Sequence, residues 1–528
     1  MKRFILIGIA VLLTVSLIAG CAGGPSKGKP ITMETDIVVI GSGGAGFSAA
    51  VTAIEAGKKV IVVEKMHFVG GNTRVAGSAF NAANPAMQRT KEMTASEMSV
   101  IKNILARPAH DDHMKRWQEN VSRDITAYEA QRARYLYDSP DLHKLHTYIG
   151  GDYVAKPELV NILGDSALDA INWLTSLGAG WTDDISAAIG ATWRRSHAPN
   201  FNFGPAGSNF VLPQEKRFTE RGGITCLEYR ADKIIMENGR AAGVSGLTAS
   251  GAPFTIKANM GVILATGGFA ANVEMRQKYN KHWPTLDANV MTTNVPSAQG
   301  DGILMADAAG ANLIDMEWIQ LVTAVPDLFP TASISDVIYV NRNGDRFVKE
   351  DGRRDEISSA VLAQPDSFFW WIADGYTIDD LLGGIAYDGR VIRDHLNNRT
   401  AFLENSVEDL ARKIGVDPAK LQQTINSYNA AVDGTIRDPH GRQVFDKKLL
   451  KPPYFAGYGL ALVHHTMGGV EINEQCQVLD RSGKIIPGLY AAGEVAGGLH
   501  GANRLGANAV ADIVVFGRIA GRSAAAGL

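Results

Sequence analysis

The sequence has few cysteines and no surplus of positive charge. Only 3 of its 528 residues are cysteine, too few for a disulfide scaffold, and no Cys-x-x-Cys-His motif for c-type haem occurs. Its 52 Lys and Arg face 55 Asp and Glu, giving a formal net charge of −3. The chain therefore lacks the basic field that binds a nucleic-acid backbone. No group of His and Cys has metal-ligand spacing, so we expect no metal site.

What the sequence does contain is typical of a large packed protein. Hydrophobic residues make up 45% and charged residues 20%, the balance of a globular rather than a disordered chain. The 56 glycines exceed the average share of roughly 7% and favour tight turns and close backbone contacts. The length predicts two to four domains.

The N-terminal segment predicts export and lipidation. Lys2 and Arg3 precede an apolar run from Phe4 to Ile18, and Ile18-Ala19-Gly20-Cys21 follows, which resembles a bacterial lipobox. We expect a signal peptide at 1–20, a lipid on Cys21 that anchors the protein to the membrane from outside the cytoplasm, and a tether at 21–33. A plain signal peptide or anchor helix remains the alternative.

A glycine-rich loop between two buried strands predicts a dinucleotide site. The apolar run Asp36–Ile40 runs into Gly41-Ser42-Gly43-Gly44-Ala45-Gly46, a G-x-G-x-x-G motif, and a small-residue helix follows. Lys59–Val63 is a second apolar run and ends at Glu64. This order of strand, turn, helix, strand and acid is the context in which the motif binds nucleotides.

Each part of the motif has a physical task. Gly41 permits the turn, Gly43 lets the backbone approach a pyrophosphate, and Gly46 lets helix and strand pack closely. The N-terminus of the helix offers free N–H groups to the phosphates. Glu64 accepts a hydrogen bond from a ribose hydroxyl.

Two later strands extend the nucleotide-binding domain. Val262–Leu264 runs into Ala265-Thr266-Gly267-Gly268, and Gly488–Ala492 into Gly493-Glu494. Asn508 begins a predicted helix whose N-terminus faces a flavin. Such scattering resembles flavoproteins with two dinucleotide-binding domains, in which the chain leaves the FAD domain and returns. We therefore expect FAD.

Five stretches together resemble the fumarate reductase and urocanate reductase flavoproteins of the flavocytochrome c type. They are Ser42–Ala56, Gly70–Asn72, Ala265–Phe269, His464–Val470 and Gly493–Asn508. The resemblance implies an α/β fold: a Rossmann-like FAD-binding domain at 34–318 and 464–528, with an inserted α+β capping domain at 319–463. It is weakest over Arg107–Val154, which looks like an insertion.

The resemblance implies the residues that bind the cofactor. No histidine occupies Gly70–Thr73, so we expect FAD to be bound noncovalently. The predicted cofactor residues are Gly41, Gly43, Gly44, Ala45, Gly46, Glu64, Lys65, Gly71, Asn72, Thr73, Ala265, Thr266, Gly267, Gly268, Gly493, Glu494, Asn508, Ala509 and Val510.

The resemblance also implies the reaction, reduction of the C=C bond of an unsaturated carboxylate by hydride from flavin N5. His464 and Arg504 then bind the carboxylate, and Arg354 donates the proton, with Arg353 as the alternative. An arginine fork matches a carboxylate with two hydrogen bonds. Because a guanidinium holds its proton tightly, Arg354 needs a relay. Glu350, Asp351 and Asp355 are candidates.

The chain departs from the fumarate-reducing pattern at the second carboxylate. Val322 stands where that pattern has a histidine, and Phe329, Pro330 and Ser333 replace further polar groups. A second carboxylate would be buried without a partner. We expect a monocarboxylate of arylacrylate or urocanate type, against an apolar wall that includes Trp283 and Trp318. Candidate partners for a urocanate imidazole are Asp327, Asp336 and Tyr339.

Electrons need a source, because the chain has neither a haem motif nor a second flavin-attachment region. We expect a separate extracytoplasmic donor, a cytochrome or a flavinylated protein. Two alternatives remain: a flavin-dependent dehydrogenase such as a 3-ketosteroid desaturase, and a flavin electron carrier without turnover.

Two further features of the sequence concern structure alone. The apolar residues of Ser406–Asp433 have helical spacing. Whether Cys226 and Cys476 form a disulfide is left open.

Overall fold

The computed structural model describes residues 28–326, 337–377 and 394–528, apart from 77–78, 189, 192, 201–202, 204–205, 444 and 446. The predicted signal peptide and Cys21 lie outside the described residues. So do Asp327, Phe329, Pro330, Ser333 and Asp336 of the predicted substrate wall.

An eight-stranded sheet forms the centre of the FAD-binding domain. Its path is β17-β18-β9-β1-β2-β6, and β7 and β8 extend it beside β9. The strands are β1 (Ile31–Ile40), β2 (Val60–Val63), β6 (Ile224–Cys226), β7 (Tyr229–Glu237), β8 (Arg240–Thr248), β9 (Pro253–Leu264), β17 (Gln477–Leu479) and β18 (Ile485–Ala491). β1 pairs in parallel with β2 and β9. All four residues of β2 are buried, as expected for a parallel strand covered on both faces.

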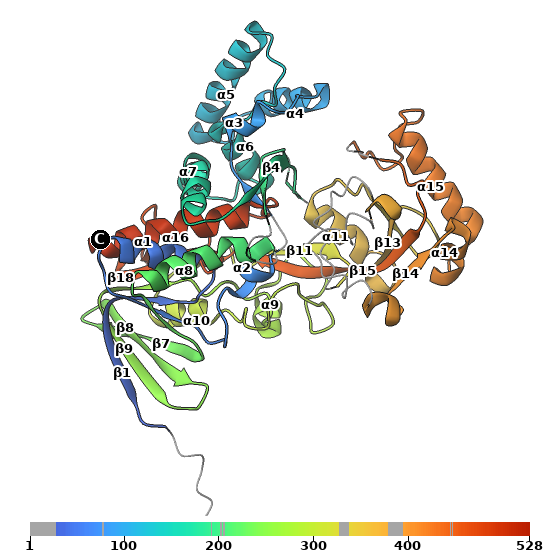
Figure 1. Cartoon of the computed structure of the whole chain (residues 1–528). Coiled ribbons are helices and arrows are strands. Elements are labelled where there is room, and N and C mark those ends of the chain that lie inside the picture. Colours follow the sequence, from blue (N-terminus) through green and yellow to red (C-terminus); the bar gives the residue numbers. More distant parts are fainter. Residues whose placement is uncertain are drawn as a thin grey trace, which may run out of the picture.

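Two helices from opposite ends of the chain lie side by side on this sheet. They are α1 (Gly44–Glu55) and α16 (Asn508–Ala526), with α8 (Leu212–Glu220) beside α1 (Figure 1). Glycines make the contact close: an added Cβ would lie 2.6 Å from Ala45 O at Gly517 and 2.4 Å from Ala49 O at Gly521. The predicted return of the chain to its first domain thus takes the form of a helix pair.

The cap has its own sheet and core. Its sheet path is β11-β15-β13-β12, with β14 also on β15. The strands are β11 (Ile319–Ala324), β12 (Ile338–Val340), β13 (Phe368–Ala373), β14 (Ala401–Glu404) and β15 (Tyr454–Thr466); the helices are α11 (Arg354–Leu362), α14 (Val407–Ile414) and α15 (Pro418–Val432). α14 and α15 confirm the helical spacing of Ser406–Asp433. They enclose a separate apolar cluster that includes Leu410, Leu421 and Tyr428.

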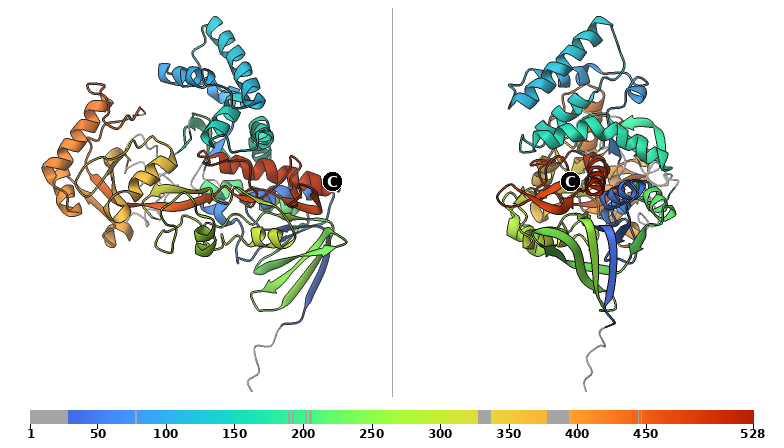
Figure 2. Two further views of the ribbon diagram at one scale, coloured as in Figure 1. Left: turned by 180° about the vertical axis from the view of Figure 1, so that it is seen from behind. Right: turned by 90° about the vertical axis from the view of Figure 1, so that its left-hand side faces the viewer.

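A helical segment stands on the FAD-binding domain, away from the central sheet (Figure 2). It comprises α3 (Pro85–Gln88), α4 (Ala95–Leu105), α5 (Asp112–Ala130), α6 (Pro140–Gly150) and α7 (Pro157–Ser176). α7 packs on α16. The stretch Arg107–Val154, where the resemblance is weakest, forms the helices α5 and α6.

The remaining elements are short. They are α2 (Gly71–Val75), β3 (Phe80–Asn81), β4 (Trp181–Ser186), β5 (Ser196–Pro199), η1 (Ala206–Phe210), α9 (Val273–Tyr279), α10 (Asp301–Ala308), β10 (Leu313–Ile314), η3 (Pro365–Ser367) and β16 (Gly469–Val470).

Cys226 and Cys476 are both free thiols. Cys476 is buried and contacts the backbone oxygen of Phe516 at 3.4 Å. Within the described residues, no helix combines the length and apolar character that crossing a membrane requires.

Candidate active site

A deep cavity lies where the parallel strands β1, β2 and β9 end. It encloses about 830 Å³ of space not filled by atoms, part of which is open solvent. Many of the predicted cofactor residues line it: Gly41, Gly43, Gly44, Ala45, Glu64, Lys65, Gly71, Asn72, Thr73, Ala265, Thr266, Gly267 and Glu494. Gly41 and Glu494, which are 453 positions apart in the sequence, thus share one cavity.

Gly41 and Gly46 make the close backbone contacts that the motif predicts. Gly41 has φ +102°, and a Cβ there would lie 2.3 Å from Ala265 O. A Cβ at Gly46 would lie 1.9 Å from Gly41 O, so neither position admits a side chain. At Gly43 the nearest atom to an added Cβ is Thr73 Oγ1 at 3.7 Å, which leaves room in front of this glycine for a ligand.

Glu64 ties the loop to β2. Its carboxylate accepts from Ser42 N at 3.0 Å, from Ser42 Oγ at 2.7 Å and from Met66 N at 2.9 Å. A carboxylate has about four acceptor positions, so one remains for the predicted ribose hydroxyl. Lys65, which also lines the cavity, forms an ion pair with Asp301.

The residues of the cavity fit FAD. α1 begins at Gly44, whose N–H donates to Thr73 Oγ1 at 3.0 Å. Because the N-cap Gly43 provides no side-chain cap, the following N–H groups of the first turn are available to a phosphate. Thr266 Oγ1 is buried and has no hydrogen-bond partner among the described residues, and a buried hydroxyl normally finds one.

Six predicted cofactor residues lie outside the lining: Gly46, Gly268, Gly493, Asn508, Ala509 and Val510. The side chain of Asn508 instead accepts from Asn81 Nδ2 at 2.8 Å and donates to Thr147 Oγ1 at 3.0 Å. Asn508 is, as predicted, the first residue of its helix. A direct role of these six toward the cofactor stays a prediction.

Two buried arginines from distant segments meet at one neutral oxygen. Gln320 Oε1, on β11, accepts from Arg354 Nη1 at 3.0 Å and from Arg504 Nη2 at 3.2 Å. The amide nitrogen of Gln320 donates to Asn503 Oδ1 and Arg504 O, both at 2.8 Å, which fixes the amide. Arg354 and Arg504 are only 7% and 4% exposed. The site therefore brings two positive charges together at one shared acceptor, while Arg504 Nη1 also donates to Leu505 O at 3.0 Å.

Burial of the arginines weakens their hold on the proton. Desolvation lowers the pKa of Arg504 to about 10. Desolvation, and then the charge of Arg504, lower the pKa of Arg354 well below its ordinary value. An anion placed between the two guanidiniums would relieve this repulsion.

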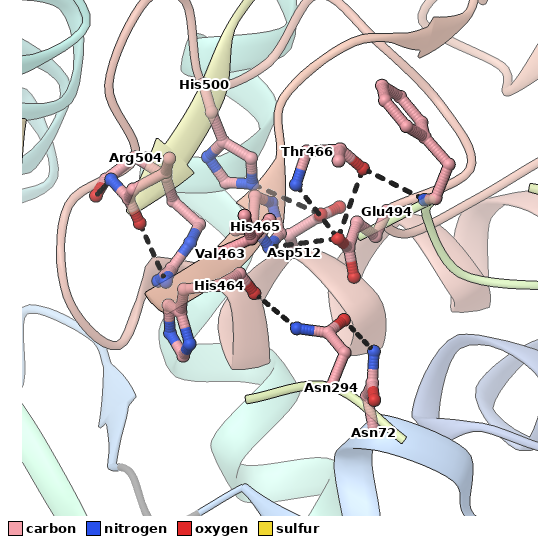
Figure 3. A network of polar contacts seen from close by, with 12 residues as sticks. Asn72, Asn294, Val463, His464, His465, Thr466, Glu494, His500, Arg504 and Asp512 are labelled. Atoms are coloured by element: carbon pink, nitrogen blue, oxygen red, sulfur yellow. Dashed lines mark hydrogen bonds and ion pairs between the residues drawn. The ribbon is translucent and has the colours of Figure 1, made fainter. Parts of the chain in front are cut away.

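His464 connects the arginines to the cofactor cavity (Figure 3). Its Nδ1 lies 2.8 Å from Thr293 Oγ1, and its backbone oxygen accepts from Asn294 Nδ2 at 2.8 Å. Asn294 in turn accepts a hydrogen bond from Asn72, which lines the cavity. Desolvation and the nearby Arg354 and Arg504 lower the pKa of His464 well below 6.5, so its imidazole is neutral at pH 7.

A buried group of histidines and carboxylates occupies the other side of β15. His465 Nδ1 lies 3.6 Å from Glu494 Oε1, and His500 Nε2 lies 3.3 Å from Asp512 Oδ2. Burial raises the pKa of Glu494. In Figure 3 the ring of His464 lies on the side of the Arg504 guanidinium, whereas His465 lies with His500 and Asp512. Alternation along the strand thus gives the two neighbouring histidines different surroundings.

The structure distinguishes the two neighbouring arginines. Arg354 joins the buried pair, whereas Arg353 is about a third exposed and pairs with Asp152 and Asp355. Among the candidate relay residues, Asp355 therefore accepts from Arg353.

The other two candidate relay residues are also engaged away from Arg354. Glu350 accepts from Arg346 at 2.6 Å and from Arg442 at 3.1 Å. Asp351 accepts from Gln443 N at 2.7 Å. The hypothesis that one of the three acids returns a proton to Arg354 stays a prediction.

The described residues of the predicted apolar wall are buried or contact other side chains and backbone groups of the protein. Val322 is 1% exposed. Trp318 stacks on His282, with ring centroids 3.9 Å apart, and Trp283 Nε1 donates to Ile319 O at 2.6 Å. The Tyr339 hydroxyl lies 3.1 Å from Thr323 Oγ1, and burial raises the pKa of Tyr339 to about 12.

Sequence reasoning missed Gln320, Thr293 and Gly190. A Cβ at Gly190 would lie 2.7 Å from Arg354 Nε, and Gly190 O accepts from Gly506 N at 3.0 Å. Gln320 stands two residues before Val322, in the stretch where the fumarate-reducing pattern has its histidine. A lone glutamine or glycine carries no spacing signal, so only the fold identifies them.

The fold and the cavity define a flavoprotein of the Rossmann type with an inserted cap. The family described as "FAD binding domain" matches residues 36–135 and 122–510. The chain belongs to this family and, within it, to the group of fumarate and urocanate reductase flavoproteins that the sequence motifs indicate.

Two curated relatives have informative names. NADH:acrylate oxidoreductase of Vibrio harveyi is 35% identical over 98% of this chain and 54% of that protein. Urocanate reductase of Eggerthella lenta is 34% identical over 95% of this chain and 76% of that protein. The chain thus spans about half the length of the first relative and three quarters of the second.

Solved structures agree on the fold. The open conformation of a flavocytochrome c3 fumarate reductase has a TM-score of 0.70 and 32% identity over 96% of this chain and 79% of that one. A 3-ketosteroid delta1-dehydrogenase from Sterolibacterium denitrificans has a TM-score of 0.68 at 19% identity, over 94% of this chain and 100% of that one. The second likeness concerns the fold alone.

Proposed function

We propose that this chain is an FAD-dependent reductase of the C=C bond of an α,β-unsaturated carboxylate. The observation that carries the proposal is the neutral oxygen of Gln320 between the buried guanidiniums of Arg354 and Arg504. Two guanidiniums held this close repel each other, and a substrate carboxylate bound beside them would offset that repulsion. An arginine fork suits the two oxygens of a carboxylate.

FAD, when bound, supplies the hydride that the β-carbon receives. Arg504 and the neutral imidazole of His464 then hold the carboxylate by hydrogen bonds. They stabilise the negative charge that develops on it as the bond is reduced, which lowers the barrier. The low exposure of the group excludes water, which strengthens these contacts.

Arg354 is the proposed proton donor to the α-carbon. Its burial and the neighbouring charge of Arg504 lower its pKa, so proton release is less costly than from an arginine in water. Gln320 holds Arg354 and Arg504 at the same oxygen. The carboxylate-binding and proton-donating groups therefore have a fixed spacing.

We propose a monocarboxylate with an apolar or aromatic tail in preference to fumarate. Buried Val322 stands where a second carboxylate needs a donor, and an unpaired buried charge is costly. Two relatives are named for acrylate and urocanate, which are both monocarboxylates, and this supports one carboxylate in the substrate. The Tyr339 hydroxyl is already engaged with Thr323, which favours an arylacrylate over urocanate.

We further propose that FAD is noncovalent, that a separate cytochrome or flavinylated protein delivers electrons, and that a lipid on Cys21 holds the enzyme on the outer side of the cytoplasmic membrane. The residues at Gly70–Thr73 and the Ile18–Cys21 sequence support the first and last points. Denaturation that releases all flavin into the supernatant tests the first. Mass spectrometry of the N-terminus of the native protein tests the last.

Anaerobic reoxidation of the dithionite-reduced holoenzyme tests the activity. The panel contains fumarate, urocanate, cinnamates, acrylate and ketosteroids. Fast reoxidation by one monocarboxylate, with fumarate at least about tenfold slower, is expected. Reoxidation by steroids, or by no acid in the panel, overturns the proposal in favour of a dehydrogenase or an electron carrier.

A further inference from the structure

Arg353, the neighbour of the proposed proton donor, links the cap to the helical segment. Its Nη1 donates to Asp152 Oδ1 at 2.6 Å and its Nη2 to Asp152 Oδ2 at 2.8 Å. This is a two-bonded fork, the geometry in which an ion pair is best defined. The hydrogen bond with Asp152 is the largest cause of the raised pKa of Arg353.

Asp152 is held in place by the backbone around it. It follows α6 with a left-handed φ of +56°, and its N–H donates to Ile149 O at 3.1 Å. The preceding Gly151 accepts from Ala502 N at 2.9 Å. A Cβ at Gly151 would lie 2.5 Å from His500 O, so this turn and the segment of Arg504 are in direct backbone contact.

The same two segments meet a second time through side chains. Asn503 Nδ2 donates to Gly150 O at 3.2 Å, and Asn503 Oδ1 accepts from Gln320. The turn at 150–152 is therefore fixed to the segment that carries Arg504. Through Asp152 it also holds the residue next to Arg354.

Arg353 and Arg354 stand at the start of α11, with Arg353 as the N-cap and Arg354 as the first helical residue. Restraint of Arg353 therefore restrains the backbone from which the Arg354 side chain extends. Asp355 also accepts from Arg353, at 3.0 and 2.8 Å, but it belongs to the same helix and links no second segment. Of the two acids, only Asp152 connects the cap to the Arg504 side of the site.

We propose that Asp152 is a positioning residue that acts through Arg353 to hold Arg354 beside Arg504 during turnover. The inference rests on the proposed function, because it assigns Asp152 a part in the spacing between the proton donor and the carboxylate site. Asp152 itself touches neither substrate nor cofactor. Its removal lowers the rate of proton delivery and leaves carboxylate binding at His464 and Arg504 in place.

The test compares Asp152→Asn with Asp355→Asn as the matched control, each in the FAD-loaded full chain. In Asp152→Asn we expect kcat to fall about fivefold to tenfold while KM stays within about twofold. The solvent isotope effect on kcat rises, because proton transfer becomes slower relative to the other steps. In Asp355→Asn we expect less than about a twofold change in kcat.

Combination variants separate positioning from a loss of folding. Arg353→Gln alone and the double variant Asp152→Asn/Arg353→Gln are expected to match Asp152→Asn, since all three remove the Arg353–Asp152 interaction and the further contact of Arg353 with Asp355 is expected to contribute less than about twofold. The exchanged pair Asp152→Arg/Arg353→Asp is expected to recover at least about half of the lost activation free energy. Affinity of the oxidised enzyme for the saturated product acid, measured by flavin absorbance, is expected to stay unchanged.

Three outcomes overturn the inference: an unchanged kcat in Asp152→Asn, additive losses in the double variant, or a loss that follows flavin content or melting temperature. These are distinguishable from failure of the proposed function. If Arg354→Gln abolishes turnover and Asp152→Asn does not affect it, only the positioning role is wrong. If Arg354→Gln retains full activity, the proposed proton donor is wrong as well.

Discussion

The cofactor cavity and the arginine pair are built in different ways. The turn of the cavity is made by backbone in close contact, such as Gly46 against Gly41 O and Gly41 against Ala265 O. The arginine pair is made by side chains from separate elements: β11 gives Gln320, α11 gives Arg354, β15 gives His464, and the segment before α16 gives Arg504.

The two regions are therefore expected to respond differently to substitution. Close backbone contacts in the cavity admit only glycine, so a changed residue there disturbs the fold and the cofactor together. The arginine pair depends on charge and on the spacing of four elements. A changed residue there is expected to leave the FAD-binding domain intact and to alter catalysis alone.

The largest effect is expected for Arg354→Gln. Loss of the proton donor lowers kcat by about a thousandfold, as for other general acids, while flavin content stays at the wild-type level. Stopped-flow reoxidation of the reduced enzyme measures the rate. The matched control is Arg353→Gln, whose neighbouring guanidinium lies outside the buried pair, with a loss of about tenfold or less. Equal losses in both variants would contradict the assignment.

Two glycine variants test how the loop of the cofactor cavity responds to an added side chain. In Gly46→Ala the Cβ would lie 1.9 Å from Gly41 O, so the protein is expected to lose about 2–4 kcal/mol of stability and to be isolated with little flavin. In Gly43→Ala the Cβ has space, so the melting temperature of the apoprotein stays within a few degrees while FAD affinity falls about tenfold.

Calorimetry of the apoproteins and fluorescence titration with FAD separate the two glycine effects. Full FAD affinity in Gly43→Ala would show that this glycine does not provide room for the cofactor. Wild-type stability in Gly46→Ala would show that loop and helix adjust more easily than their contact indicates.

The sequence predicted the cofactor cavity better than the arginine pair, because the loop of the cavity is formed by neighbouring residues and the arginine pair by separate elements. The loop at Gly41–Gly46 is local, so its spacing alone indicates the turn, and the structure confirms it. His464, Arg504 and Arg354 came from motif resemblance, and the structure brings Arg354 and Arg504 to one oxygen. Gln320 and Asp152 act through contacts between distant segments, and no local pattern distinguishes them from ordinary polar residues.

Gln320→Glu tests whether the arginine pair binds an anion, because it places a carboxylate of the protein itself between the two guanidiniums. The new carboxylate lies between two guanidiniums and competes with the substrate, so KM is expected to rise about tenfold to a hundredfold. The melting temperature rises or stays the same, and FAD content is unchanged. Steady-state kinetics with the best acid measure KM, and Gln320→Met is the control, without the added charge. An unchanged KM in Gln320→Glu would contradict anion binding at this place.

The smallest effect concerns a carboxylate in the segment that leads into β11. Desolvation raises the pKa of Asp315 from 3.8 to about 6. The folded state therefore binds this proton more tightly than the unfolded state. The contribution of Asp315 to stability is greatest below pH 4 and declines as the pH rises to about 6.

Asp315→Asn removes this decline. Between pH 4 and pH 6 its free energy of unfolding is expected to fall less than that of the wild type, by about 1 kcal/mol or less, since part of the carboxyl is exposed to solvent. Urea unfolding of the holoenzyme at pH 4, 5, 6 and 7 measures the difference. Because Asp315 belongs to neither region, kcat at pH 7 is expected to stay within about twofold of the wild-type value. A large loss of activity in Asp315→Asn would show that the segment around Asp315 contributes to the site of the arginine pair.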